Sequence, residues 1–174
     1  DKDFFTFMIL DSLLCGPTSI NIFGGGGTSN KTCRLYHALV ETELTIGVRG
    51  GLQATIDPFL YEIGATLRPD RTTKEVLTAL DAQVDRLQQE LVPEPEIARA
   101  AKQARALFAY NTETITNQGA WAGLVEMFAG QEWLETYLEQ LAGVTPEAVQ
   151  RAAQIYLRPE NRVVGAYTPK EASR

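Results

Sequence analysis

The chain contains one histidine and two cysteines, and these small numbers exclude several kinds of site. A catalytic zinc ion normally takes three protein ligands, and a Ser-His-Asp triad could use only His37. Cys15 and Cys33 can form neither a framework of several disulfides nor a four-cysteine zinc site. The residue types therefore predict no self-sufficient active site in this chain.

The chain also lacks an excess of positive charge and a long apolar run. Its 16 Lys and Arg residues oppose 22 Asp and Glu residues, so the net charge is -6. No local basic patch offsets this charge, and we expect no binding to nucleic acid. The longest apolar stretch, residues 4–15, is interrupted by polar residues and is too short to cross a bilayer as a helix. We expect a soluble protein without a membrane span, and the compartment stays unknown.

The composition is that of an ordinary globular domain. The 174 residues are 44% hydrophobic and 22% charged, which predicts one domain rather than a disordered or fibrous segment. The chain opens at Asp1 without a methionine or a signal peptide. We therefore expect residues 1–174 to be a single unit within a longer protein.

Hydrophobic patterning predicts an α+β fold, with helices layered on an antiparallel sheet. Apolar residues cover every face of residues 4–15, which indicates a buried helix. Thr72-x-x-Glu75 is a capping box that opens a further helix. Strands are expected at 44–55, 59–67 and 162–167. The other helices are expected at 31–42, at 131–141, from Thr145 to Leu157, and from 96 to about 130. The last of these is expected to be interrupted near Asn117 and Gly119.

The glycine-rich segment resembles a phosphate-binding loop without matching it. Gly25 to Thr32 approaches the pattern GxxxxGK[ST], but Asn30 stands where the second glycine belongs. We favour a flexible connector around Gly24–Gly27 over nucleotide binding. Asn30-Lys31-Thr32 also fits the N-glycosylation sequon, which is common by chance.

Two pairs four residues apart involve His37. His37 and Glu41 could supply two metal ligands from one helix, but no third ligand follows at a readable spacing. A surface ion pair or hydrogen bond is the simpler interpretation. Cys33 and His37 could form a thiol–imidazole pair, which nothing else nearby supports.

The order of several motifs resembles the pitrilysin/insulinase zinc metallopeptidases, in particular the branch that contains mitochondrial processing peptidase and its bacterial relatives. The resemblance covers nearly the whole chain. The motifs that carry it are Asp11-Ser-Leu-Leu-Cys-Gly16, the Gly/Thr/Ser loop, Cys33-Arg-Leu-Tyr-His-Ala-Leu-Val-Glu41, the expected hairpin, Val144–Ala153 and Tyr156–Gly165.

The resemblance implies a fold and a place in a larger enzyme. These peptidases consist of paired α+β units that close like a clamshell over an unfolded peptide, and their His-x-x-Glu-His zinc motif lies in the N-terminal unit. Residues 1–174 resemble the partner C-terminal unit. No catalytic or metal-binding residue carries over to this chain, and zinc is expected only in the full-length protein.

One departure from the family concerns its partners. Some C-terminal units carry an arginine and a tyrosine that grip the substrate, and those positions are Val40 and Ile46 here. Neither side chain can donate a hydrogen bond. The resemblance therefore implies a zinc-bearing subunit that obtains the Arg/Tyr pair from a second subunit, or a homodimer.

The predicted function is the non-catalytic half of a zinc metalloendopeptidase subunit, which forms part of the chamber around an extended peptide. Leu44, Ile46 and Val48 are the expected substrate-binding residues, because their strand would offer a sheet edge or an apolar surface. The alternative is a proteolytically inactive structural or assembly subunit of the same fold.

Overall fold

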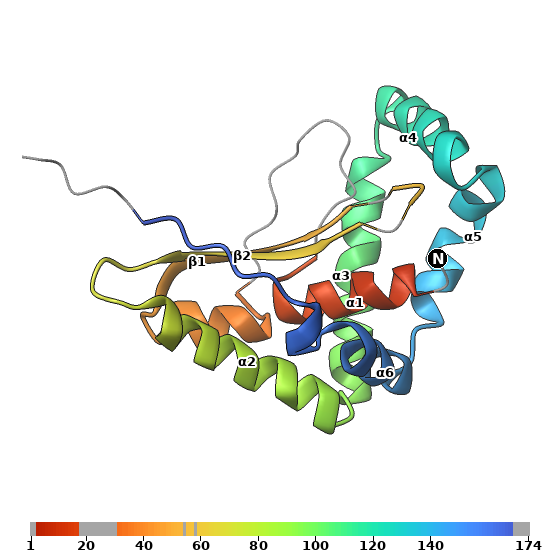
Figure 1. Cartoon of the computed structure of the whole chain (residues 1–174). Coiled ribbons are helices and arrows are strands. Elements are labelled where there is room, and N and C mark those ends of the chain that lie inside the picture. The colour runs from red at the N-terminus through yellow and green to blue at the C-terminus, as the bar shows by residue number, and fades with distance from the viewer. Residues whose placement is uncertain (1–2, 18–30, 54, 58, 169–174) are drawn as a thin grey trace, which may run out of the picture.

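The computed structural model describes residues 3–17, 31–53, 55–57 and 59–168, and Figure 1 shows their arrangement. The expected connector at Gly24–Gly27, the sequon at Asn30 and most of the phosphate-loop pattern lie outside the described residues. The elements are α1 (Phe4–Leu14), the π-helix η1 (Tyr36–Val40), β1 (Thr45–Leu52), β2 (Tyr61–Leu67), α2 (Thr73–Gln89), α3 (Glu94–Asn111), α4 (Ile115–Phe128), α5 (Gln131–Ala142), α6 (Pro146–Tyr156) and the 3-10 helix η2 (Pro159–Asn161).

The predicted fold class is confirmed, because helices pack on an antiparallel sheet. β1 and β2 pair from Thr45 opposite Leu67 to Leu52 opposite Tyr61, with a bulge between Thr45 and Gly47. Among the described residues the sheet has only these two strands.

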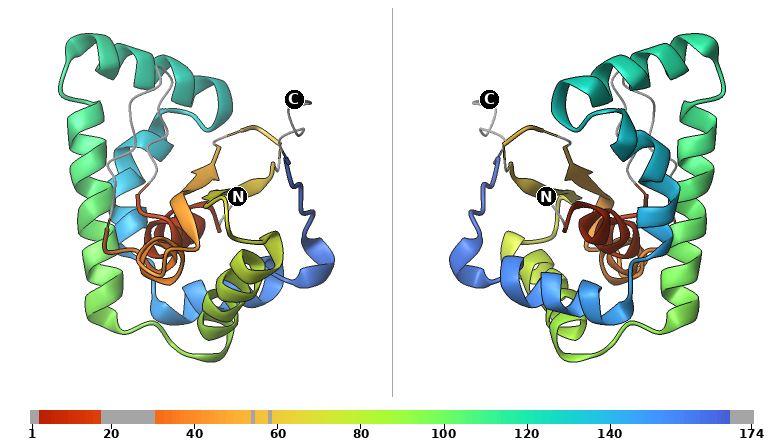
Figure 2. Two further views of the ribbon diagram at one scale, coloured as in Figure 1. Left: turned by 90° about the vertical axis from the view of Figure 1, so that its left-hand side faces the viewer. Right: turned by 90° about the vertical axis from the view of Figure 1, so that its right-hand side faces the viewer.

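The predicted third strand at 162–167 is wrong. Beyond η2 the chain runs near β2 without joining the sheet (Figure 2). Val163 is 96% exposed and Tyr167 is 93% exposed. Valine-rich sequence forms a strand only where it pairs with another strand and packs one face, and this segment does neither.

The core surrounds α1, which lies between the sheet and the other helices in Figure 2. As predicted, α1 is buried on nearly every side. Phe5 stacks on Trp133 of α5, with 5.4 Å between the ring centroids. Just before α1, the buried Asp3 pairs with Arg151 and accepts a hydrogen bond from the Tyr156 hydroxyl at 2.9 Å. These contacts tie α1 to α5 and α6.

Capping residues set several helix boundaries. The predicted capping box is present, since the Thr72 hydroxyl accepts the Glu75 N–H and the Glu75 carboxylate accepts the Thr72 N–H. The predicted interruption of the long helical tract is misplaced. The tract breaks at residues 112–114, because Thr114 caps α4 by accepting the Asn117 N–H at 3.2 Å.

The helix predicted at 31–42 is also shorter than expected, and η1 forms its main part. None of the helices in the described part of the chain is long and apolar enough to cross a membrane.

Candidate functional site

The two faces of the hairpin have different surroundings. Val48 and Leu52 of β1 pack on the core, as do Tyr61 and Ile63 of β2. The alternate residues point outward, as expected from the period of two along a strand. The sheet therefore covers the core with one face and leaves its outer face uncovered by any other described strand.

The structure separates the three predicted substrate-binding residues. Leu44 and Val48 are partly buried and pack against the core. Ile46 is 65% exposed, because the bulge at Thr45 and Gly47 makes it the extra residue of β1. Ile46 is thus the member of the set that is available to another molecule.

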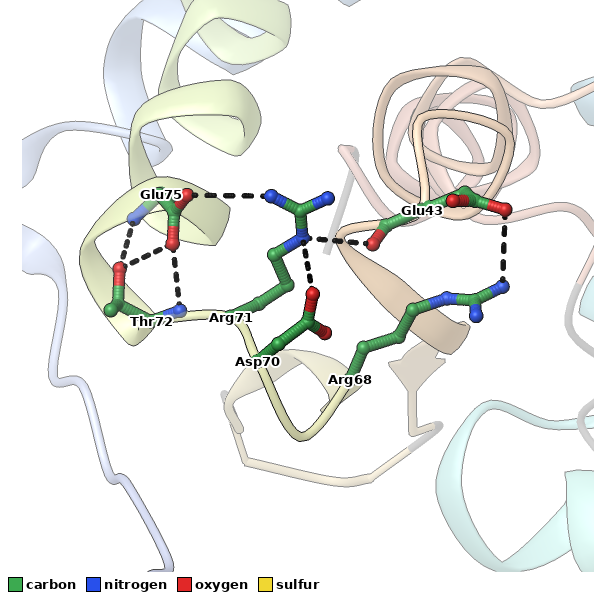
Figure 3. Close-up of polar contacts among 6 residues, drawn as sticks. All are labelled: Glu43, Arg68, Asp70, Arg71, Thr72 and Glu75. Atoms are coloured by element: carbon green, nitrogen blue, oxygen red, sulfur yellow. Dashed lines mark hydrogen bonds and ion pairs between the residues drawn. The ribbon is translucent and has the colours of Figure 1, made fainter.

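A sharp turn before β1 places Ile46. Glu43 has a φ of 59°, a left-handed conformation that residues with a side chain rarely adopt. The Arg71 Nε donates a hydrogen bond to the Glu43 carbonyl at 3.3 Å, and Arg68 lies 3.9 Å from the Glu43 carboxylate (Figure 3). Arg71 also lies 3.8 Å from Glu75 of the capping box (Figure 3). The start of α2 therefore supports the turn that leads into β1.

The outer face of the hairpin carries few side chains and one basic residue, Arg49. Gly47 and Gly51 of β1 and Gly64 of β2 have no side chain there. A Cβ atom at Gly64 would lie 3.0 Å from the Arg49 Cζ, so the Arg49 guanidinium lies directly over this glycine. Another backbone could approach closely at Gly47, where a Cβ atom would meet nothing within 4 Å.

A buried polar contact holds the inner face of the hairpin. The Tyr61 hydroxyl donates a hydrogen bond to the Asp11 Oδ1 at 2.9 Å, and Asp11 is 1% exposed. Burial, with Cys15 and Asp11 nearby, raises the pKa of Tyr61. Burial and Asp11 likewise raise the pKa of the Cys15 thiol. Both groups therefore stay protonated at neutral pH, which suits a structural role and not a nucleophile.

The remaining sequence candidates do not converge on a reactive site. The His37 Nδ1 and the Glu41 Oε2 lie 2.7 Å apart, and both side chains are about half exposed. Cys33 is buried, and burial raises the pKa of its thiol. Within residues 3–17, 31–53, 55–57 and 59–168, no three His, Cys, Asp or Glu side chains form a group suited to a metal ion. The described donor set does not fit a zinc site.

Sequence reasoning missed two features of this region. The contact between Asp11 and Tyr61 joins residues far apart in the chain, and the only sequence signal was a lone acid in an apolar helix. The position of Arg49 over Gly64 depends on the pairing register, which the spacing of apolar residues did not specify.

Comparisons with known proteins find a matching family and solved structures of similar fold. The family model of the peptidase M16 inactive domain matches residues 1–104. A "putative zinc protease" from Bordetella pertussis Tohama I is 25% identical, with a TM-score of 0.79 over 98% of this chain and 87% of that one. The "inactive peptidase domain of a putative zinc protease" from Bordetella parapertussis is 26% identical, with a TM-score of 0.80 over 100% of this chain and 88% of that one.

A third structure extends the comparison of folds. A protease from Helicobacter pylori is 17% identical, with a TM-score of 0.75, and the match covers 91% of this chain and 35% of that one. A search of proteins with curated functions finds no significant match.

Proposed function

The chain belongs to the peptidase M16 family, whose inactive-domain model it matches, and from this premise we propose that it is the non-catalytic half of a zinc metallopeptidase subunit of the mitochondrial processing peptidase-like branch. In this proposal residues 1–174 form one C-terminal unit, and a separate N-terminal unit supplies the zinc and the general base. The donor set described above supports this division, because the described residues offer no site for the metal.

The proposed role of this unit is to line the peptide chamber with the β1–β2 hairpin. The observation that carries it is the exposed Ile46 on β1, beside a strand edge that no described strand covers. An extended peptide can add to such an edge through main-chain hydrogen bonds. Leu44 and Val48 would shape this strand from the core side, and Ile46 would contact the peptide. A second subunit would supply the Arg/Tyr pair that Val40 and Ile46 do not provide.

Cleavage of an unstructured peptide by the full-length protein with its natural partner tests the proposal. We expect cleavage that a zinc chelator abolishes. Ile46→Asp should raise KM several-fold, because a charge would replace the exposed apolar contact. Ile56→Asp is the matched control, since Ile56 is 74% exposed in the turn of the same hairpin. Equal effects of the two variants would contradict the assigned role of Ile46.

The alternative is an inactive structural or assembly subunit of the same fold. The lack of a metal-binding group among the described residues is compatible with it. Zinc content separates the two functions when it is measured on the full-length protein and on the 174-residue chain. One zinc ion per full-length polypeptide and none in the chain would support the peptidase. No zinc in either, with no chelator-sensitive cleavage, would favour the structural subunit.

A further inference from the structure

The outer face of the hairpin holds one exposed cation, the guanidinium of Arg49. Arg49 of β1 lies opposite Gly64 of β2 in the pairing register. A Cβ atom at Gly64 would lie 3.0 Å from the Arg49 Cζ and 3.1 Å from its Nε. The guanidinium therefore lies directly on the main chain of β2, and a side chain at position 64 would displace it.

The Arg49 side chain has no partner of opposite charge. In the part of the chain that the structure describes, it forms no ion pair and no side-chain hydrogen bond. Glu62 is the one acidic residue within the two strands, and it lies opposite Gly51 and not opposite Arg49. A guanidinium has five N–H donors and can bind a carboxylate through two of them. Arg49 is thus available to a carboxylate of another molecule.

Arg49 lies beside the edge at which the proposed peptide would bind. Arg49 and the exposed Ile46 both face outward from β1, and Arg49 follows Ile46 by three residues. A rise of about 3.3 Å per residue separates them by at most roughly 10 Å along the strand. On a peptide strand added to β1, a residue opposite Arg49 would have its Cβ about 5 Å from the Arg49 Cβ. A glutamate there and Arg49 are long enough to meet.

We propose that Arg49 determines substrate specificity by binding the carboxylate of an acidic residue in an extended peptide that lies along β1. This inference rests on the proposed function, because it takes β1 as a wall of the peptide chamber. The acidic residue would lie two or three positions from the peptide residue that contacts Ile46.

Charge complementarity selects an acidic residue at this one position. The net charge of -6 disfavours acidic peptides in general. Arg49 reverses that effect only where a carboxylate can reach it. The preference should therefore be confined to a single position of the peptide.

Binding of fluorescent peptides to the full-length protein with its natural partner tests the proposal. A zinc chelator is present throughout, so that binding is measured without cleavage. Unstructured, otherwise uncharged peptides carry one glutamate at successive positions, each with a glutamine peptide as reference. At one position glutamate should bind about threefold to fivefold more tightly than glutamine, as expected for an exposed ion pair. Salt should reduce this preference, and Arg49→Gln should abolish it.

Two matched controls separate the charge from the fold. Glu62→Gln removes a charge from the same exposed face and should keep the preference for glutamate. Gly64→Ala should weaken the preference, because the new Cβ displaces the guanidinium, and it should have no further effect in the Arg49→Gln background. Gly51→Ala should keep the preference, since the nearest atom to its Cβ is 3.8 Å away. Circular dichroism checks that each variant is folded.

The outcomes for Arg49 and for the peptidase are distinguishable. Equal binding of glutamate and glutamine peptides, the same preference at every position, or a preference that survives Arg49→Gln would each overturn the role of Arg49. Chelator-sensitive cleavage without a charge preference would overturn that role and leave the proposed function standing. An Arg49-dependent preference without any cleavage would support the role of Arg49 and contradict the peptidase. Absence of all peptide binding would overturn the role of Arg49 as well.

Discussion

The hydroxyl of Tyr61 donates a hydrogen bond to the carboxylate of Asp11 at 2.9 Å and so connects β2 to α1 inside the protein. Tyr61→Phe removes this donor from a buried carboxylate, and we expect a loss of about 1–3 kcal/mol in the free energy of unfolding. Denaturant unfolding measures it. Tyr110→Phe is the control, because Tyr110 is 73% exposed and should change the stability little. Equal effects would mean that the buried hydrogen bond contributes nothing.

The same contact predicts a dependence of stability on alkaline pH. Burial, with Cys15 and Asp11 nearby, raises the pKa of Tyr61 in the folded state. Tyr61 therefore contributes stability that is present below its unfolded pKa of about 10 and is lost as pH rises toward the folded value. Unfolding free energies should fall more steeply above pH about 10 in the wild type than in Tyr61→Phe. Both proteins should carry Cys15→Ala, because the raised pKa of Cys15 acts in the same direction. Parallel curves would contradict the assignment.

Gly50 has no room for a side chain. A Cβ atom there would lie 1.8 Å from the Asp11 Oδ1 and 2.9 Å from the Cys15 Cβ. Gly50→Ala should therefore destabilise the protein by about 2–3 kcal/mol, as overpacking of a core does. Gly51→Ala is the matched control on the opposite face, where the nearest atom is 3.8 Å away. Thermal unfolding should give a much lower Tm for Gly50→Ala than for Gly51→Ala.

The left-handed turn at Glu43 predicts that glycine is more stable than alanine at this position. Glu43→Gly and Glu43→Ala both remove the carboxylate that lies near Arg68, but only glycine adopts the φ of 59° without a steric penalty. We expect Glu43→Gly to be more stable than Glu43→Ala by about 1 kcal/mol in denaturant unfolding. If Glu43→Ala were as stable as Glu43→Gly or more stable, the turn would have to relax away from the left-handed region.

The capping box at the start of α2 predicts that its removal lowers the stability of the protein at neutral pH. Thr72→Ala removes the hydroxyl that accepts the Glu75 N–H, and a lost N-cap typically lowers stability by about 1 kcal/mol. Thr78→Ala should change little, because the Thr78 hydroxyl only contacts a carbonyl within the same helix.

The effect of Thr72→Ala on stability should also depend on pH. Hydrogen bonds from Thr72 hold the pKa of Glu75 below its usual value. The associated stability is therefore present above the unfolded pKa of Glu75 and is lost as pH falls through the folded value. The difference between wild type and Thr72→Ala should shrink in acid, and a constant difference would contradict this coupling.

Local signals in the sequence predicted much of the fold. The capping box at Thr72 and Glu75 is read from four residues, and the burial of α1 follows from apolar residues on all its faces. The prediction of a third strand is wrong because Val163 and Val164 show only that a segment suits a sheet, not that a partner strand is present. For the candidate site, the sequence located the hairpin but not its exposed residue, since the bulge that turns Ile46 outward depends on pairing with β2.

By itself the sequence determined the fold class, most helix boundaries and the family resemblance, because caps, turns and apolar periodicity act between residues that are close in the chain. Only the tertiary structure decided that Ile46 is exposed while Leu44 and Val48 pack on the core, and that Gly50 must accommodate Asp11. Each of these relationships joins segments far apart in the chain. Their geometry follows from packing around α1, which no local pattern records.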